Sequence, residues 1–157
     1  MNKLSWCLKT KNGIELKEPN EHLANAYLKK AEGSLETMRV ITSKEWKITT
    51  AYYGMYFSVY AILMRIGIKC EIHSCTIEFV KLFLGHYFNR EEILLLSMAL
   101  QARIDSQYYT NRRLPENLSK EIKDKAEDFF LKCKSIVPLI NEKEAVAIRK
   151  RLQTINL

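Results

Sequence analysis

Hydrophobic positions recur with helical spacing along most of this chain, most densely from Lys47 to Gly67. Ile48 to Met64 carries no charged residue. Apolar or aromatic residues recur with helical spacing at Trp46, Tyr53, Tyr56, Phe57, Tyr60, Leu63 and Met64, and Thr49, Thr50 and Gly67 fall on the same stripe. Helical spacing with so wide an apolar face predicts a central helix that is buried on most of its surface.

A core helix is not the only possible role of this stretch. A membrane-spanning helix needs roughly 20 apolar residues, whereas this run is shorter and contains Tyr, Thr, Ser and Gly. The aromatic side chains could also line a cofactor pocket, but stripes of this kind are more common in protein cores. We therefore predict neither a membrane span nor a cofactor.

The pattern before the central helix predicts an arm and one long helix. Residues 1–19 contain the turn dipeptide Asn12-Gly13, so we expect an irregular or briefly ordered arm, with Trp6 a candidate to pack on the helical body. The helix should begin near Asn20. Gly33 lies inside it and is unfavourable there, so we expect a close helix crossing at Gly33.

Further helices are predicted after the central one. Thr42 or Ser43 can cap the central helix and Gly67 can end it. Later helices are expected to begin at Ser74, Asn89, about Asn117 and Asn141. The helix after Asn89 should bury the line Ile93, Leu96, Leu100 and Ile104. The helix from Asn117 to about Val137 should bury Ile122, Ala126, Phe129, Phe130, Cys133 and Ile136.

The composition supports one helical domain. The chain has 157 residues with only 5 Gly and 3 Pro, too few for the many turns of an all-β fold. We predict a single domain over residues 1–157, with its core at about 19–137. The fold class should be all-α, an antiparallel up-down bundle of four to five core helices with an extra C-terminal helix.

The net charge indicates which kinds of partner the protein could bind, and the cysteine pattern indicates its cellular compartment. The formal charge is +7, which suits RNA, DNA or an acidic partner but also occurs on ordinary basic surfaces. Cys7, Cys70, Cys75 and Cys133 form no CxxC pair, and no secretory signal pattern precedes Gly13. We expect a cytoplasmic protein with reduced thiols.

One polar cluster stands at the end of an otherwise apolar helix. Its candidate binding residues are Arg103, Gln107, Tyr108, Tyr109 and Arg112. Arg103 could bind a phosphate, and Tyr108 or Tyr109 could stack on a base. On a regular helix Tyr108 points about 140° away from Arg103, so a joint site needs a helix end, a distortion or a second subunit. An ion pair of Arg103 with a carboxylate is the ordinary alternative.

Three segments resemble small stand-alone proteins of the HEPN superfamily, the kind associated with nucleotidyltransferases. Residues 51–57 (AYYGMYF) resemble that group's AYYAMF core helix, and Ile72-His73-Ser74 resembles its His-Ser segment. Residues 103–108 (RIDSQY) resemble its RxxADY motif, followed by a late helix at 126–130. The resemblance spans about residues 19–137. It implies a helical bundle, a homodimer and a cleft between subunits near Arg103.

The resemblance also implies a possible activity. Many HEPN proteins are metal-independent ribonucleases that use an Arg and, four to six residues later, a His. Here Tyr108 stands five positions after Arg103, and Gln107 replaces the usual Asp. A Tyr with a pKa near 10 is a poor base. We therefore predict a dimeric module that binds RNA, a nucleotide or a nucleotidyltransferase partner, ahead of an RNA-cleaving toxin with Arg103 and Tyr108 as catalytic residues.

Other candidate chemistry is weaker. His73 or His86 could replace the missing His, but nothing nearby in the sequence forms a catalytic pair. Cys70, His73 and Cys75 lack the spacing and the fourth ligand of common zinc sites, so no metal is predicted. The basic run 149–151 suits a helix C-terminus at least as well as a polyanion. A plain scaffold with no nucleic-acid role is the third hypothesis.

Overall fold

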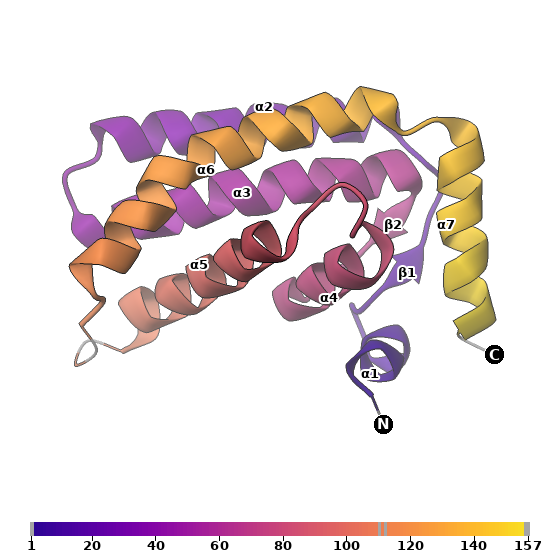
Figure 1. Cartoon of the computed structure of the whole chain (residues 1–157), viewed down its shortest axis with the longest axis horizontal. Coiled ribbons are helices and arrows are strands. Elements are labelled where there is room, and N and C mark those ends of the chain that lie inside the picture. Colours follow the sequence, from indigo (N-terminus) through magenta and orange to yellow (C-terminus); the bar gives the residue numbers. More distant parts are fainter. Residues whose placement is uncertain (1, 110, 112, 156–157) are drawn as a thin grey trace.

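A computed structural model describes residues 2–109, 111 and 113–155. Within them the protein is an all-α bundle with one very small sheet (Figure 1). Its elements are α1 (Lys3–Lys9), β1 (Glu15–Leu16), α2 (Glu21–Val40), α3 (Lys44–Ile66), β2 (Ile68–Lys69), α4 (His73–Phe83), α5 (Arg90–Tyr108), α6 (Glu116–Ile136), the short 3₁₀ helix η1 (Val137–Leu139) and α7 (Glu142–Ile155). The predicted all-α fold class is confirmed.

The helix α3 is the centre of the bundle. It packs against α2 and α6 on one side and against α5 on the other, with α4 beside α5 (Figure 1). Most of its side chains are buried, including Tyr52, Met55 and Ile62. The predicted central helix is thus confirmed. No helix in the described part of the chain is long and apolar enough to cross a membrane.

Capping residues fix the helix ends, as most of the sequence signals indicated. The side chains of Asn20, Ser43 and Asn141 each accept from a backbone N–H three residues later. Asn89 and Glu92 form a reciprocal capping box at the start of α5. Gly67 ends α3 with a φ of 90°, a left-handed conformation that favours glycine.

The close helix crossing lies at Gly54, not at Gly33. A Cβ built on Gly54 would lie 2.5 Å from Leu35 Cδ2, so the missing side chain lets α2 pack tightly on α3. A Cβ on Gly33 would meet nothing within 4 Å. The expectation for Gly33 is therefore wrong.

Two further helix predictions are corrected. Ser74 is the second residue of α4, whose N-cap is Ile72 without a side-chain cap. In α5 the buried residues are Leu95, Leu96, Ala99 and Ala102. Ile93, Leu100 and Ile104 are only partly buried, because α5 turns its small residues toward α3 instead. In α6, by contrast, all six predicted inward residues are buried.

The N-terminal arm is ordered and covalently attached. The segment folds into α1, turns at Asn12 (φ 62°), and forms β1, which pairs antiparallel with β2. A disulfide joins Cys7 of α1 to Cys75 of α4, so the expectation of reduced thiols is wrong for this pair. Trp6 is 45% exposed, so the folded chain covers it only in part.

The last helix, α7, lies across the end of the bundle (Figure 1). Two of its arginines hold it there. Arg149 donates to the backbone carbonyls of Lys17 and Gly67. Arg151 donates to the carbonyl of Leu82 and lies over the Phe83 ring. These two members of the basic run 149–151 are therefore structural contacts.

Candidate functional site

Arg103 lies against aromatic rings of α3. Its Cζ is 5.2 Å from the ring centre of Tyr53 and 5.9 Å from that of Tyr52, close enough for cation–π attraction. Nε of Arg103 is buried without a hydrogen-bond partner, and within the described residues its guanidinium forms no ion pair. Tyrosine faces, and not the carboxylate of the alternative interpretation, lie against this cation.

His73, the first residue of α4, completes the same cluster. Its Nδ1 lies 2.6 Å from the Tyr52 hydroxyl, and its ring is stacked parallel on Tyr56 with centroids 4.0 Å apart. Burial, with a contribution from the nearby charge of Arg103, lowers the pKa of His73 to about 4. The imidazole is therefore neutral at pH 7.

The protonation of the cluster follows from this geometry. Burial raises the pKa of Tyr52 well above its usual range, with Tyr56 adding to the rise. Tyr52 therefore keeps its proton, and its hydroxyl shares a 2.6 Å hydrogen bond with Nδ1 of His73. The cluster offers one cation beside neutral rings, and neither His73 nor Tyr52 has a pKa near 7 for proton transfer.

A line of rings extends from this cluster along α3. Tyr53 is stacked on Phe57 with centroids 5.2 Å apart, and Tyr27 of α2 follows at 6.0 Å. Lys30 Nζ lies 5.1 Å from the ring centre of Phe57. We call these five residues, Arg103, Tyr53, Phe57, Tyr27 and Lys30, the aromatic strip. It carries half-buried rings with a cation at each end.

Tyr108 and Gln107 lie apart from the strip. Because α5 is helical through Tyr108, that side chain points away from Arg103, as the 140° separation predicted. Tyr108 is 68% exposed. With Gln107 it lines a surface hollow of about 420 Å³ between α3 and α5. The helix end thus does not bring Arg103 and Tyr108 together within one subunit.

Tyr109 caps the C-terminal end of α5 and lines a second hollow, of about 620 Å³. Arg112 lies outside the described residues. Of the five candidate binding residues, Gln107 and Tyr108 share one hollow, Tyr109 lines the next, and Arg103 belongs to the strip. The cluster partners Tyr52, Tyr53 and His73 were not assigned to a common site from the sequence.

The remaining candidates fall elsewhere. His86 Nε2 lies 2.8 Å from Glu144 of α7, which also accepts from Tyr87, so His86 helps to hold α7. Burial, and then the hydrogen bond to Glu144, raise the pKa of Tyr87 to about 12. The sulfur of Cys75 is bonded to Cys7, which removes it from any metal site with Cys70 and His73.

Comparison with known proteins finds no match to this chain: no protein-family model matches it, and no curated protein does. The resemblance to the HEPN superfamily therefore stays a prediction that rests on the three quoted segments. The features that bear on function are therefore the geometry of the cluster, the aromatic strip and the hollows.

Proposed function

We propose that this protein is a helical RNA-binding module that holds single-stranded RNA along the aromatic strip. The observation that carries the proposal is Arg103 itself. Its cation is fixed by tyrosine rings, no carboxylate of the described residues neutralises it, and Nε is left without a partner. An arginine with unused donors beside half-buried rings suits a phosphate next to stacked bases.

The length of the strip supports a strand rather than a single nucleotide. Rings at Tyr53, Phe57 and Tyr27 follow one another between the cations of Arg103 and Lys30. Every base has a face that can stack on a ring, and the two cations can attract the backbone. The net charge of +7 favours the approach of a polyanion.

The HEPN resemblance extends the proposal to partners. It implies a homodimer in which two Arg103 surfaces face each other across a cleft, and a small nucleotidyltransferase as a second partner. The cytoplasm, where RNA is met, is the compartment that this function requires. Thiols there are kept reduced, so RNA binding has to survive reduction of the Cys7–Cys75 bond.

An RNA-cleaving toxin is the second candidate function. One observation favours it, since His73 and Arg103 contact the same rings, those of Tyr52 and Tyr53. The pKa of about 4 and the engaged Nδ1 make His73 a weak base, however. Binding without cleavage therefore ranks first.

RNA affinity tests the proposal. Fluorescence anisotropy with a labelled single-stranded RNA should show binding that weakens steeply with salt, and Arg103→Ala should weaken it about tenfold and lower the salt slope by about one. Arg90→Ala removes the same charge from an exposed position on the same helix and should bind as wild type. Equal affinity of all three proteins would refute the proposal.

The same proteins separate binding from cleavage. Unlabelled cellular RNA is incubated with wild type and Arg103→Ala without added metal, and its integrity is followed on a gel. Intact RNA with wild type is expected. Cleavage by wild type that Arg103→Ala abolishes would establish the second candidate instead.

A further inference from the structure

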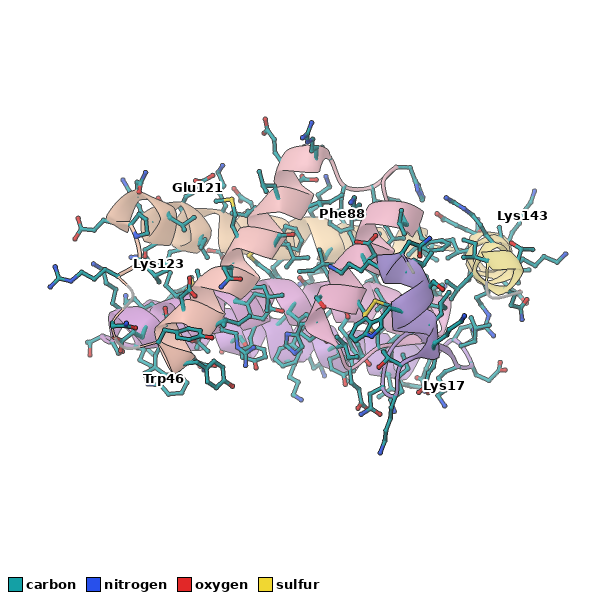
Figure 2. All side chains as sticks on the ribbon, turned by 90° about the horizontal axis from the view of Figure 1, so that it is seen from below. Lys17, Trp46, Phe88, Glu121, Lys123 and Lys143 are labelled. Carbon is teal, nitrogen blue, oxygen red and sulfur yellow. A yellow bond between two sulfur atoms is a disulfide. The ribbon has the colours of Figure 1, made fainter. Side chains whose placement is uncertain are left out.

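The hollow between α3 and α5 has the shape and chemistry of a separate subsite. It encloses about 420 Å³ beside the first turns of α3 and the last turn of α5. Figure 2 shows Trp46 at this edge, where α5 crosses the start of α3. It is lined by Glu45, Trp46, Thr49, Ser106, Gln107 and Tyr108.

Two hydroxyl groups in its wall lack hydrogen-bond partners. Oγ1 of Thr49 and Oγ of Ser106 are buried, and neither has a partner within the described residues. Thr49 is only 3% exposed. Buried hydroxyls are nearly always hydrogen-bonded in folded proteins. The two hydroxyls lining this hollow are therefore free to donate to an acceptor group of a ligand at that depth.

The rim of the hollow supplies flat apolar faces and one carboxylate. Trp46 is 54% exposed and Tyr108 is 68% exposed, so both rings are available for stacking. Glu45 is exposed and makes no hydrogen bond or ion pair with the part of the chain that the structure describes. A ligand that fits has a planar ring, adjacent N–H donors for the carboxylate and an acceptor for a hydroxyl.

Among the RNA bases, guanine alone carries this combination. Its N1–H and N2–H₂ groups lie side by side and can donate to the two oxygens of a carboxylate, while O6 accepts from a hydroxyl. Adenine places an acceptor where guanine has N1–H, and uracil has no amino group. A carboxylate would therefore disfavour both of these bases.

We propose that the hollow is a guanine-binding subsite, which reads one base of the RNA strand held on the aromatic strip. Glu45 selects the donor edge, Thr49 and Ser106 satisfy O6, and Trp46 and Tyr108 stack on the ring. The inference rests on the proposed function, because Arg103 lies one turn from Ser106 on α5 and fixes the strand beside the hollow. Lys44 and Arg113 line the adjoining hollow, where Lys44 is paired with Glu116 and not with Glu45.

Tryptophan fluorescence can report on this subsite alone. The chain has only Trp6 and Trp46, so Trp6→Phe leaves Trp46 as the single reporter. Guanosine monophosphate should quench its emission at concentrations at least about tenfold lower than uridine or adenosine monophosphate do. Glu45→Gln in the same background should abolish that preference. Glu71→Gln, an exposed carboxylate paired with Lys69 on β2, is the matched control and should keep it.

Failure of the subsite and failure of RNA binding give different results. If RNA binds through Arg103 but the nucleotides quench equally, the guanine subsite is refuted and the proposed function stands. If guanosine monophosphate binds selectively but RNA does not bind, the subsite is supported and the proposed function falls. If neither binds, both proposals are refuted.

Discussion

At the scale of single residues, His73 shows how its neighbours set its chemistry. The ring is stacked on Tyr56, contacts Tyr52 and Tyr53, and lies near the charge of Arg103. Burial and the cation both oppose a second positive charge, so the neutral ring is part of the folded state. Protonation of His73 should therefore lower the free energy of unfolding.

This coupling predicts a pH-dependent stability. The pKa of His73 is about 4 when folded and about 6.5 when unfolded, so between these values the unfolded chain binds more protons. The contribution is complete above pH 6.5 and is lost as the pH falls toward 4. Because the ring is partly exposed, we expect a loss of only about 1 kcal/mol. Urea unfolding at several pH values should show that the unfolding free energy of wild type falls between pH 6.5 and 4, and that it falls less for His73→Asn. Equal pH dependence of the two proteins would contradict this role of His73.

Two glycines in adjacent helices should respond in opposite directions. Gly33→Ala adds a methyl in open space and should raise the free energy of unfolding by about 0.5–1 kcal/mol. Gly54→Ala forces a methyl against Leu35 and should lower it by about 1–3 kcal/mol. Chemical denaturation of both variants measures these two changes in the free energy of unfolding. A stabilised Gly54→Ala would mean that α2 and α3 are not tightly packed there.

At the scale of elements, the two ends of the chain are each fixed to the bundle by a specific device. The disulfide Cys7–Cys75 connects α1 to α4. Arg149 connects α7 to the carbonyls of Lys17 and Gly67, at the C-terminal end of α3. A cation at that end also interacts favourably with the dipole of α3.

Reduction of the disulfide should destabilise the protein without stopping RNA binding. The bond closes a loop across 68 positions, and by chain entropy such a loop contributes up to about 4 kcal/mol. A reductant should lower the melting temperature of wild type but not that of Cys7→Ser. RNA affinity should be unchanged in both, because the aromatic strip lies on α2, α3 and α5. Equal melting temperatures of wild type with and without reductant would contradict this role.

Loss of the arginine anchor should loosen α7. Arg149→Gln removes hydrogen bonds from a charged donor to two carbonyls, and it should cost about 1.5–3 kcal/mol of unfolding free energy. Lys150→Gln removes a charge from an exposed neighbour and should change stability by less than about 0.5 kcal/mol. Denaturant unfolding of both variants measures how much unfolding free energy each one loses. Similar losses would show that charge, not the contact of Arg149, is what matters.

At the scale of the whole molecule, the helices could be predicted from sequence but their contacts only in part. Caps at Asn20, Ser43 and Asn89 act through neighbours within three residues, so local spacing reveals them. In α5 the pattern identifies the buried Leu96 but not Ala99 and Ala102, which are buried too and carry little hydrophobic signal.

The site was harder to predict, for a related reason. Arg103 was recognised as a candidate from its polar neighbours. Its contacts with Tyr52, Tyr53 and His73 depend on how α3, α4 and α5 pack, and the Cys7–Cys75 bond depends on where α1 folds back. Such contacts between distant segments leave no periodic pattern in one sequence.

The dimer is also a property of the whole molecule. Sedimentation should give a mass near twice 18.4 kDa at micromolar concentration, falling on dilution. Tyr53→Glu places a charge beside Arg103 on the proposed shared surface and should shift the protein toward monomer. A wild-type monomer at every concentration would refute the shared cleft.

The most direct test of RNA binding along the aromatic strip is to find which residues contact the bound RNA. Ultraviolet crosslinking to a single-stranded RNA, followed by mass spectrometry of the attached peptides, reports the contacting residues without any substitution. RNA held on the aromatic strip and in the hollow should crosslink to Tyr53, Phe57 and Trp46, on one face of α3. Crosslinks confined to the basic residues of α7, such as Lys143 and Lys150, would contradict it.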